Sequence, residues 1–250
     1  MSQGVTFVTG KGGVGKSTVA AALARASGAR LAVFAHTGPS GALVLRPAEC
    51  RQAVAARLFG SRRLARAFLG SEPVRALLDV SDAVTALVAF AELERAAEGA
   101  PLVFDMPATG HALSWFRSLP VLEGLAGGGR LKAFVASVRR WIRAPQHRLA
   151  IVTTAESFVL SETRELIEAA RSLPDALADQ ALIVNRVPPA RSAPASASSF
   201  PEAHARLNDW NMLRTQAEAF RDEAGASTHL LVDRIGARNL VAAMAEELAA

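Results

Sequence analysis

The chain has 250 residues, half of them hydrophobic, and a formal net charge of +5. That length suits one domain with a modest insertion, so we expect residues 1–250 to form a single domain. No apolar run reaches the ~18–20 residues of a membrane span, and the N-terminus lacks a signal-peptide layout, which predicts a cytoplasmic protein. The single cysteine, Cys50, excludes a disulfide framework and a cysteine-cluster metal site within one chain. We attribute the basic balance to an arginine-rich composition, so a nucleic-acid partner is not expected.

Short apolar runs predict the strands of a buried sheet. The strands are expected at residues 4–9, 31–35, 101–105, 149–154, 181–185 and 229–232. Each run is almost continuously apolar, which is typical of parallel strands covered on both faces. Helical patterns, the first over residues 17–26, lie between them. We therefore predict an α/β fold with a doubly wound, mostly parallel sheet, whose ligand lies at the carboxyl ends of the strands.

Two segments are too long for simple crossovers between strands. Residues 47–99 read as several short helices, with breaks at glycines 60, 70 and 99, and residues 112–147 read as two more. We expect these insertions to form a small helical subdomain. Residues 188–201 are rich in Pro, Ser and Ala, a composition that predicts a mobile loop.

A glycine-rich loop follows the first strand. Its sequence, GKGGVGKS, matches the P-loop pattern at Gly10, Gly15, Lys16 and Ser17. In this pattern the backbone N–H groups surround phosphates, Lys16 reaches the β- and γ-phosphates, and the Ser17 hydroxyl ligates Mg²⁺. The predicted ligands are therefore ATP and Mg²⁺, on a fold of the P-loop NTPase type. Further loop residues expected at the nucleotide are Gly12, Gly13, Val14 and Thr18.

The loop carries a second lysine, Lys11, directly after its first glycine. The string KGGVGKS resembles the deviant Walker A motif of the dimeric ATPases that include the nitrogenase iron protein, MinD, ParA and ArsA. The resemblance implies that Lys11 reaches the nucleotide of a partner subunit. It also implies that the active form is a homodimer or a heterodimer with a related ATPase.

Four further segments resemble the ArsA family, which includes arsenite-pump ATPases and ATPases that target tail-anchored membrane proteins. One of them, residues 154–169 (TAESFVLSETRELIEA), resembles its strand–helix segment with an ET-RLI pattern. Residues 103–111 (VFDMPATGH) resemble its switch II, and Asp105 at the end of a strand suits a Mg²⁺-bound water. Residues 182–187 (LIVNRV) resemble its base-binding strand end, which implies that Asn185 and Arg186 lie at the adenine. Residues 229–240 resemble the segment that closes the base pocket. The resemblance implies an ATP hydrolase that serves a protein client or a membrane-protein partner.

The chain departs from this family in switch I. The family has an Asp there that orients the attacking water, whereas this chain reads AHTGPS at residues 35–40. Thr37 takes the Asp position, or Gly38 if the alignment shifts by one residue. The first acidic residue of the whole chain is Glu49, so no carboxylate is available in this region. We therefore expect slow hydrolysis with intact ATP binding. The paired cysteines of an interfacial zinc site are also missing, so no zinc is expected.

Three functional hypotheses remain open at this point. The first is an ArsA-type ATPase that acts as a nucleotide-driven switch. The second is a hydrolysis-deficient scaffold or heterodimer subunit, and the third is a ParA- or MinD-like positioning ATPase that binds DNA or membrane. The switch II segment favours the first two hypotheses, and the missing switch I carboxylate favours the second over the first.

Residues 131–142 have the pattern of a basic amphipathic helix that ends before Pro145. Leu131, Phe134, Val135, Val138, Trp141 and Ile142 fall on one face, and basic residues lie toward the other. We favour a helix that packs on its own domain with a solvated basic face. Binding to an anionic membrane or to a client segment is the alternative.

Overall fold

The computed structural model describes residues 4–72, 78, 81–107, 109–175, 177, 179–189, 201–224, 228–232 and 240–249. Its centre is a seven-stranded sheet with the order β3-β2-β4-β1-β5-β6-β7, in which every recorded pairing is parallel. The strands are β1 (Val5–Gly10), β2 (Arg30–Phe34), β3 (Leu43–Leu45), β4 (Leu102–Asp105), β5 (Arg148–Thr154), β6 (Asp179–Val187) and β7 (Thr228–Val232). The predicted parallel α/β sheet is confirmed.

Strand β3 is the one strand that the sequence pattern did not predict. It has three residues, and it exists through its pairing with β2, where Ala32, Val33 and Phe34 lie opposite Leu43, Val44 and Leu45. A segment this short carries no periodicity of its own, so only the neighbouring strand defines it.

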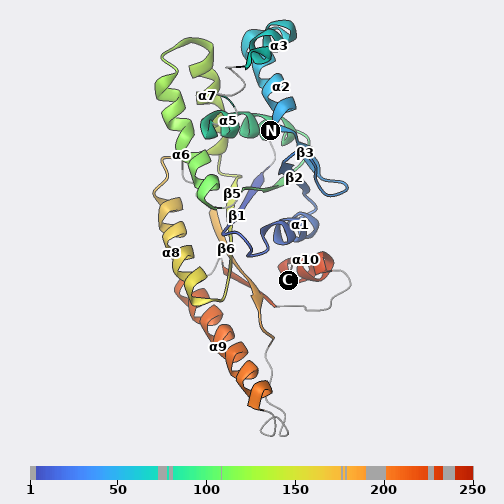
Figure 1. The fold of residues 1–250 in the computed structure, drawn as a ribbon, viewed down its shortest axis with the longest axis vertical. Helices are drawn as coiled ribbons and strands as arrows, with labels where there is room; N and C mark the ends of the chain where they lie inside the picture. The colour runs from blue at the N-terminus through green and yellow to red at the C-terminus, as the bar shows by residue number, and fades with distance from the viewer. Residues whose placement is uncertain are drawn as a thin grey trace.

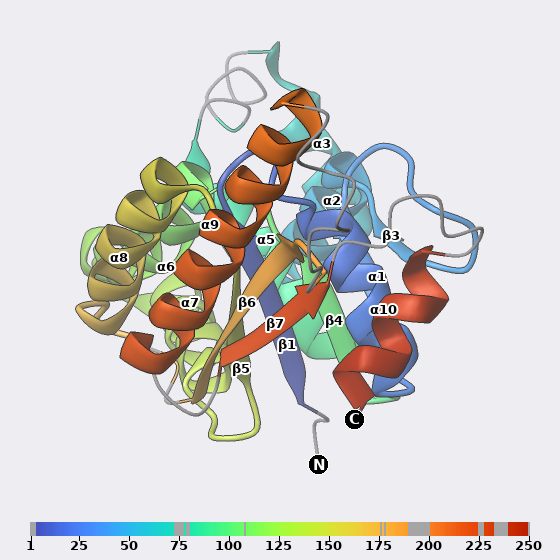
Figure 2. The same ribbon diagram turned by 90° about the horizontal axis from the view of Figure 1, so that it is seen from below.

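Helices cover both faces of the sheet, as Figure 2 shows in a view with α1 and α10 on one side and α6, α8 and α9 on the other. The helices are α1 (Lys16–Ala26), α2 (Pro47–Phe59), α3 (Arg62–Gly70), α5 (Asp82–Ala96), α6 (Thr109–Leu125), α7 (Gly129–Ile142), α8 (Ser157–Arg171), α9 (Pro201–Ala224) and α10 (Leu240–Ala249). Figure 1 places α3 and the α6–α7 hairpin at one end of the long axis, and α9 toward the other.

Two hydrophobic clusters form because successive strand residues point to opposite faces of the sheet. On β1, Phe7 joins the cluster beneath α5 to α8, and Val8 joins the cluster beneath α1 and α10. On β4, Phe104 and Val103 divide in the same way. Each strand is therefore apolar on both faces, which is the reason that its sequence reads as a continuous apolar run.

The two helical insertions are present, and they share the core of the sheet. Phe7 meets the rings of Phe90 (α5), Phe116 (α6) and Trp141 (α7) edge-on, with centroids 5.8, 5.6 and 6.4 Å away. Helices α5, α6 and α7 thus form a layer of the main domain. Helix α3 extends beyond that layer. This position agrees with its burial, since Ala65 is its one buried residue.

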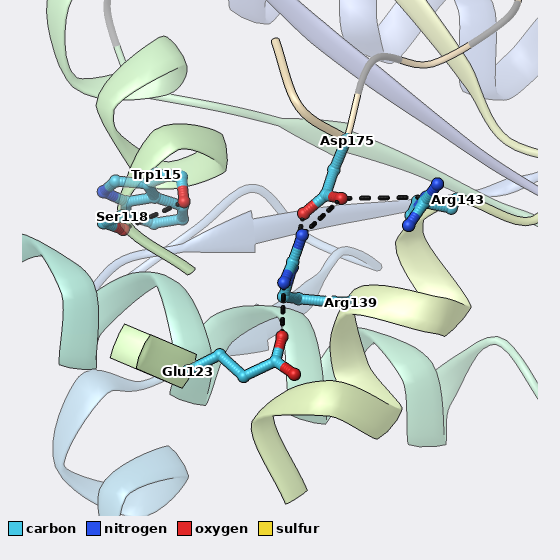
Figure 3. Close-up of polar contacts among 6 residues, drawn as sticks. All are labelled: Trp115, Ser118, Glu123, Arg139, Arg143 and Asp175. Carbon is cyan, nitrogen blue, oxygen red and sulfur yellow. Dashed lines mark hydrogen bonds and ion pairs between the residues drawn. The ribbon is translucent and has the colours of Figure 1, made fainter. Parts of the chain in front are cut away.

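An arginine–carboxylate network fixes the insertion to the sheet connections (Figure 3). Arg139 of α7 donates Nε to Oδ2 of Asp175 at 2.7 Å and Nη2 to Oδ1 at 2.9 Å. Its Nη1 pairs with Glu123 of α6. Asp175 is 2% exposed, so the bidentate pair satisfies a carboxylate that has almost no access to water. The network joins α6, α7 and the segment before β6.

The amphipathic helix expected at residues 131–142 lies within α7. Val135, Val138 and Ile142 are fully buried and Trp141 nearly so, which is the packed arrangement that we favoured. The mobile loop predicted over residues 188–201 falls mostly at residues 190–200, outside the described residues. None of the described helices combines the length and the apolar composition that a membrane crossing requires.

Candidate functional site

The turn between β1 and α1 depends on glycines that other residues cannot replace. Gly10, Gly13 and Gly15 have φ values of 152°, 87° and 90°, in the range that disfavours L side chains. A Cβ on Gly10 would lie 2.1 Å from the Val152 carbonyl oxygen of β5. The β1 chain therefore turns out of the sheet against the backbone of its neighbour, and α1 begins directly after Gly15 with no side-chain cap.

Lys16 closes the loop from inside. Its Nζ donates to the carbonyl oxygen of Lys11 at 3.3 Å. The Lys16 side chain thus lies across its own loop. It lies near the N-terminus of α1, where no side chain caps the helix. An anion that enters the loop would offer Lys16 a stronger partner than a neutral carbonyl, because the ammonium would then also be attracted by an opposite charge.

Asp105 ends β4 beside this loop. Burial raises the pKa of the Asp105 carboxyl above its ordinary value, while a hydrogen bond from Ser17 and the charge of Lys16 act in the opposite direction. Its Oδ1 is buried without a hydrogen-bond partner. Buried carboxylate oxygens normally have partners, so this oxygen is a vacant acceptor beside the Ser17 hydroxyl. A hydroxyl and a carboxylate are oxygen ligands of the kind that Mg²⁺ prefers.

Asn185, near the end of β6, forms a hydrogen bond with the backbone of the loop. Its Nδ2 donates to the Val14 carbonyl oxygen at 2.8 Å across 171 positions of sequence, and the residue is buried. A Cβ on Gly15 would lie 2.5 Å from the same Nδ2, so only glycine admits this approach. Arg186 follows with φ at 58°, where the β6–β7 pairing shifts register. Backbone of this kind is costly, and it concentrates at functional sites.

Lys11 is held within its own chain. Its Nζ forms an ion pair with Oε2 of Glu162 on α8 and lies 4.3 Å from the centroid of the Phe158 ring. Phe158 is 68% exposed. Both residues lie in the segment at residues 154–169 that resembles the ArsA family, but the sequence pattern did not assign either of them a contact with the loop. Only the packing of α8 beside the loop could have identified them.

Thr37 lies in the exposed bend after β2. The neighbouring Gly38 has no room for a side chain, since a Cβ there would lie 2.8 Å from a methyl group of Val33 and 2.8 Å from one of Val44. Of the two residues that could occupy the switch I position, Thr37 is therefore the one whose side chain faces solvent freely.

The predicted residues divide into two groups. The structure brings the P-loop lysines, Ser17, Asp105 and Asn185 together at the carboxyl ends of β1, β4 and β6. Gly12, Gly13 and Thr37 lie exposed, and Thr18 is half-buried in the first turn of α1. The base-pocket segment at residues 229–240 falls mostly outside the described residues, as does part of switch II.

The loop and Asp105 fit a magnesium-bound nucleoside triphosphate. The fit is based on the vacant Asp105 oxygen beside Ser17, on the uncapped start of α1, and on Lys16 placed within the loop. Together with the parallel sheet, these features are consistent with a doubly wound fold of the P-loop NTPase kind. No protein-family model matches this chain. No curated protein shows significant sequence similarity to it.

Proposed function

We propose that this protein is a Mg²⁺-dependent, ATP-binding P-loop ATPase of the ArsA type, which works as a dimeric nucleotide-driven switch with slow hydrolysis. The observation that carries the proposal is the vacant, buried Asp105 oxygen beside Ser17 and Lys16. A carboxylate kept partly desolvated next to a P-loop lysine has a cost in free energy that a bound cation would relieve.

Different residues would bind the phosphates, the metal ion and the base. Lys16 would leave the Lys11 carbonyl for phosphate oxygens, and the N–H groups at the start of α1 would face the same anion. Ser17 and Asp105 would hold Mg²⁺, which neutralises phosphate charge when it is bound. Asn185 lies on the opposite side of the loop and supports its backbone at Val14. The resemblance to the ArsA family assigns the base to this side.

We expect slow hydrolysis because switch I has no acidic side chain that could orient the attacking water. Residues 35–48 contain no acidic side chain, and Thr37 offers a neutral hydroxyl in an exposed bend. A positioned group that accepts a proton from water contributes about 10²–10⁴-fold to such a reaction. A chain without one would bind ATP and release it, or would hydrolyse it with help from a partner subunit.

The test is ATP binding and turnover on the purified full chain. We expect calorimetry to detect ATP binding that requires Mg²⁺ and is lost in Lys16→Ala, with turnover far below the ~1 s⁻¹ of ordinary ATPases. Thr37→Asp should raise phosphate release by about tenfold or more. Failure to bind ATP would refute the proposal, and an ordinary rate for the unmodified protein would refute its hydrolytic part.

Gly38→Asp is the matched control for Thr37→Asp. It adds the same carboxylate one residue later, where the methyl groups of Val33 and Val44 leave no room. We expect this variant to lose stability and to gain no activity. A gain in Gly38→Asp but not in Thr37→Asp would show that the alignment is shifted by one residue.

A further inference from the structure

The end of the molecule formed by α3 exposes large apolar side chains. Phe59 at the end of α2 is 40% exposed, and Leu64 and Phe68 on α3 are 57% and 46% exposed. The rings of Phe59 and Phe68 lie 5.1 Å apart between centroids, so they form one patch. Figure 1 shows that α3 lies at the extremity of the long axis. A contiguous apolar patch at such a protruding end marks a contact surface.

Arginines surround this patch. Arg62, Arg63 and Arg66 lie on α3 itself, and Arg130 lies at the start of α7 beside the same cavity as Phe59; all four are exposed. Within the described part of the chain, none of the four forms an ion pair. Glu49 lies nearby in the groove between α2 and α3, but it pairs with Arg46. Among the described residues, the surface therefore carries positive charge that no ion pair neutralises.

An apolar cavity opens directly beneath the patch. Its volume is about 360 Å³, and Phe59, Phe68, Leu58 and Leu131 are among its lining residues. The volume falls within the range of about 300–1,000 Å³ that is usual for sites of small apolar ligands. Because the cavity continues inward from the patch, the apolar chain of a ligand could enter it between α2 and α3. The anionic end of the same ligand would then lie at the arginines.

The distribution of side chains on α3 favours a lipid surface over other partners. A phosphate backbone would use the arginines but would leave Leu64, which has no ring to stack on a base, without a role. In a bilayer both kinds of side chain have a place, since arginines reach headgroups while apolar residues enter the boundary of the acyl chains. The contrast with α7 is informative, because α7 is also basic and amphipathic but buries four of the six residues on its apolar face, Val135, Val138, Trp141 and Ile142.

We propose that α3 and the adjoining end of α2 form a docking surface for bilayers that contain anionic lipids. Leu64, Phe68 and Phe59 enter the interface of the bilayer, and the four arginines contact the headgroups. The surface lies in the helical insertion, so the proposal is independent of ATP binding at the P-loop.

Co-sedimentation of the full chain with vesicles tests this proposal. Phosphatidylglycerol–phosphatidylcholine vesicles should bind the protein at low salt, and pure phosphatidylcholine vesicles should bind it weakly. Because each arginine near an anionic surface contributes about fivefold, neutralising Arg62, Arg63 and Arg66 to Gln should lower partitioning about 100-fold. Leu64→Gln should lower it roughly tenfold. Salt should weaken binding of the unmodified protein as it screens the headgroups.

Matched controls lie on α9, toward the opposite end of the molecule. Met212 is 53% exposed there and Arg206 is exposed, so Met212→Gln and Arg206→Gln should leave vesicle binding unchanged. Leu64→Trp gives a direct signal, since its fluorescence should shift to the blue on anionic vesicles and be quenched by brominated lipid. The proposal is refuted by absence of binding at low salt, by equal losses in the control variants, or by binding to duplex DNA in place of vesicles.

Discussion

Lys11 of the P-loop and Glu162 of α8 form an ion pair within one chain, with the ring of Phe158 packed 4.3 Å from the Lys11 ammonium. A lysine that acts on a partner's nucleotide cannot keep this contact. Dimer closure would therefore exchange an internal partner for an external one, and the strength of the internal contact would set part of its free-energy cost.

Glu162→Gln should make ATP-dependent dimerisation easier. Both side chains are 39% exposed, so the pair contributes at most about 1 kcal/mol. The concentration for half-maximal dimerisation should fall by about two- to fivefold, as measured by analytical ultracentrifugation with ATP and Mg²⁺. Glu165→Gln, an exposed neighbour on the same helix, should change nothing. Weaker dimerisation in Glu162→Gln would instead mean that Glu162 belongs to the dimer contact.

Asp105→Asn should stabilise the ligand-free protein while it impairs metal binding. Burial is the main cause that raises the pKa of Asp105, so the charged carboxylate opposes folding and an amide of the same shape relieves that cost. We expect urea denaturation to show a gain of about 0.5–2 kcal/mol, the range that single stabilising substitutions commonly give. Mg²⁺ should no longer strengthen ATP binding. Asp209→Asn, an exposed change on α9, should do neither.

Asn185→Asp should loosen the P-loop. The variant keeps the shape but replaces the donor that holds the Val14 carbonyl with a carboxylate oxygen, which leaves a buried acceptor unpaired at a cost of about 1–3 kcal/mol. Both the melting temperature and the affinity for ATP should fall. Asn211→Asp on the surface of α9 is the control. Unchanged ATP affinity in Asn185→Asp would show that the loop does not need this support.

Arg139→Met should destabilise the fold strongly. Among its contacts with described residues, Asp175 would keep only the longer one with Arg143, at 3.7 Å, although its side chain is 1% exposed. Removing one partner of a buried ion pair typically costs about 3–5 kcal/mol, which chemical denaturation would measure. Arg140→Met, one residue away and exposed, should stay within about 0.5 kcal/mol of the unmodified protein. Equal effects of the two changes would contradict the network in Figure 3.

Stability should fall as the pH drops below the ordinary pKa of histidine, and His147 is the cause. Burial lowers the pKa of His147, and its Nδ1 accepts a hydrogen bond from the Val5 N–H at 3.0 Å, which requires an unprotonated nitrogen. Below about pH 6.5 the unfolded chain therefore binds a proton that the folded chain resists, and the free energy of unfolding declines by up to about 1.4 kcal/mol per pH unit. His147→Gln should flatten the dependence of melting temperature on pH between 7 and 5.5. An unchanged slope would assign the effect to another group.

The local features of this protein can be read from its amino-acid sequence. Continuous apolar runs predicted all the sheet strands except β3, because strands covered on both faces need no polar alternation. The spacing of Gly10 and Gly15 before Lys16 predicted the turn and the start of α1, because these backbone conformations are available to glycine and to few other residues. The absence of an acid before Glu49 is likewise a fact of sequence alone.

The side chains that contact the loop from distant parts of the sequence are defined by tertiary packing. The contact of Asn185 with Val14, the pairing of Lys11 with Glu162, and the vacant oxygen of Asp105 depend on the lateral order of β4, β1, β5 and β6. Strand order is set by packing between elements that are far apart in the chain, so a local sequence pattern does not predict it. The same reason explains why two basic amphipathic helices have opposite environments: α7 is covered by α5 and α6, whereas α3 lies beyond the layer that would cover it.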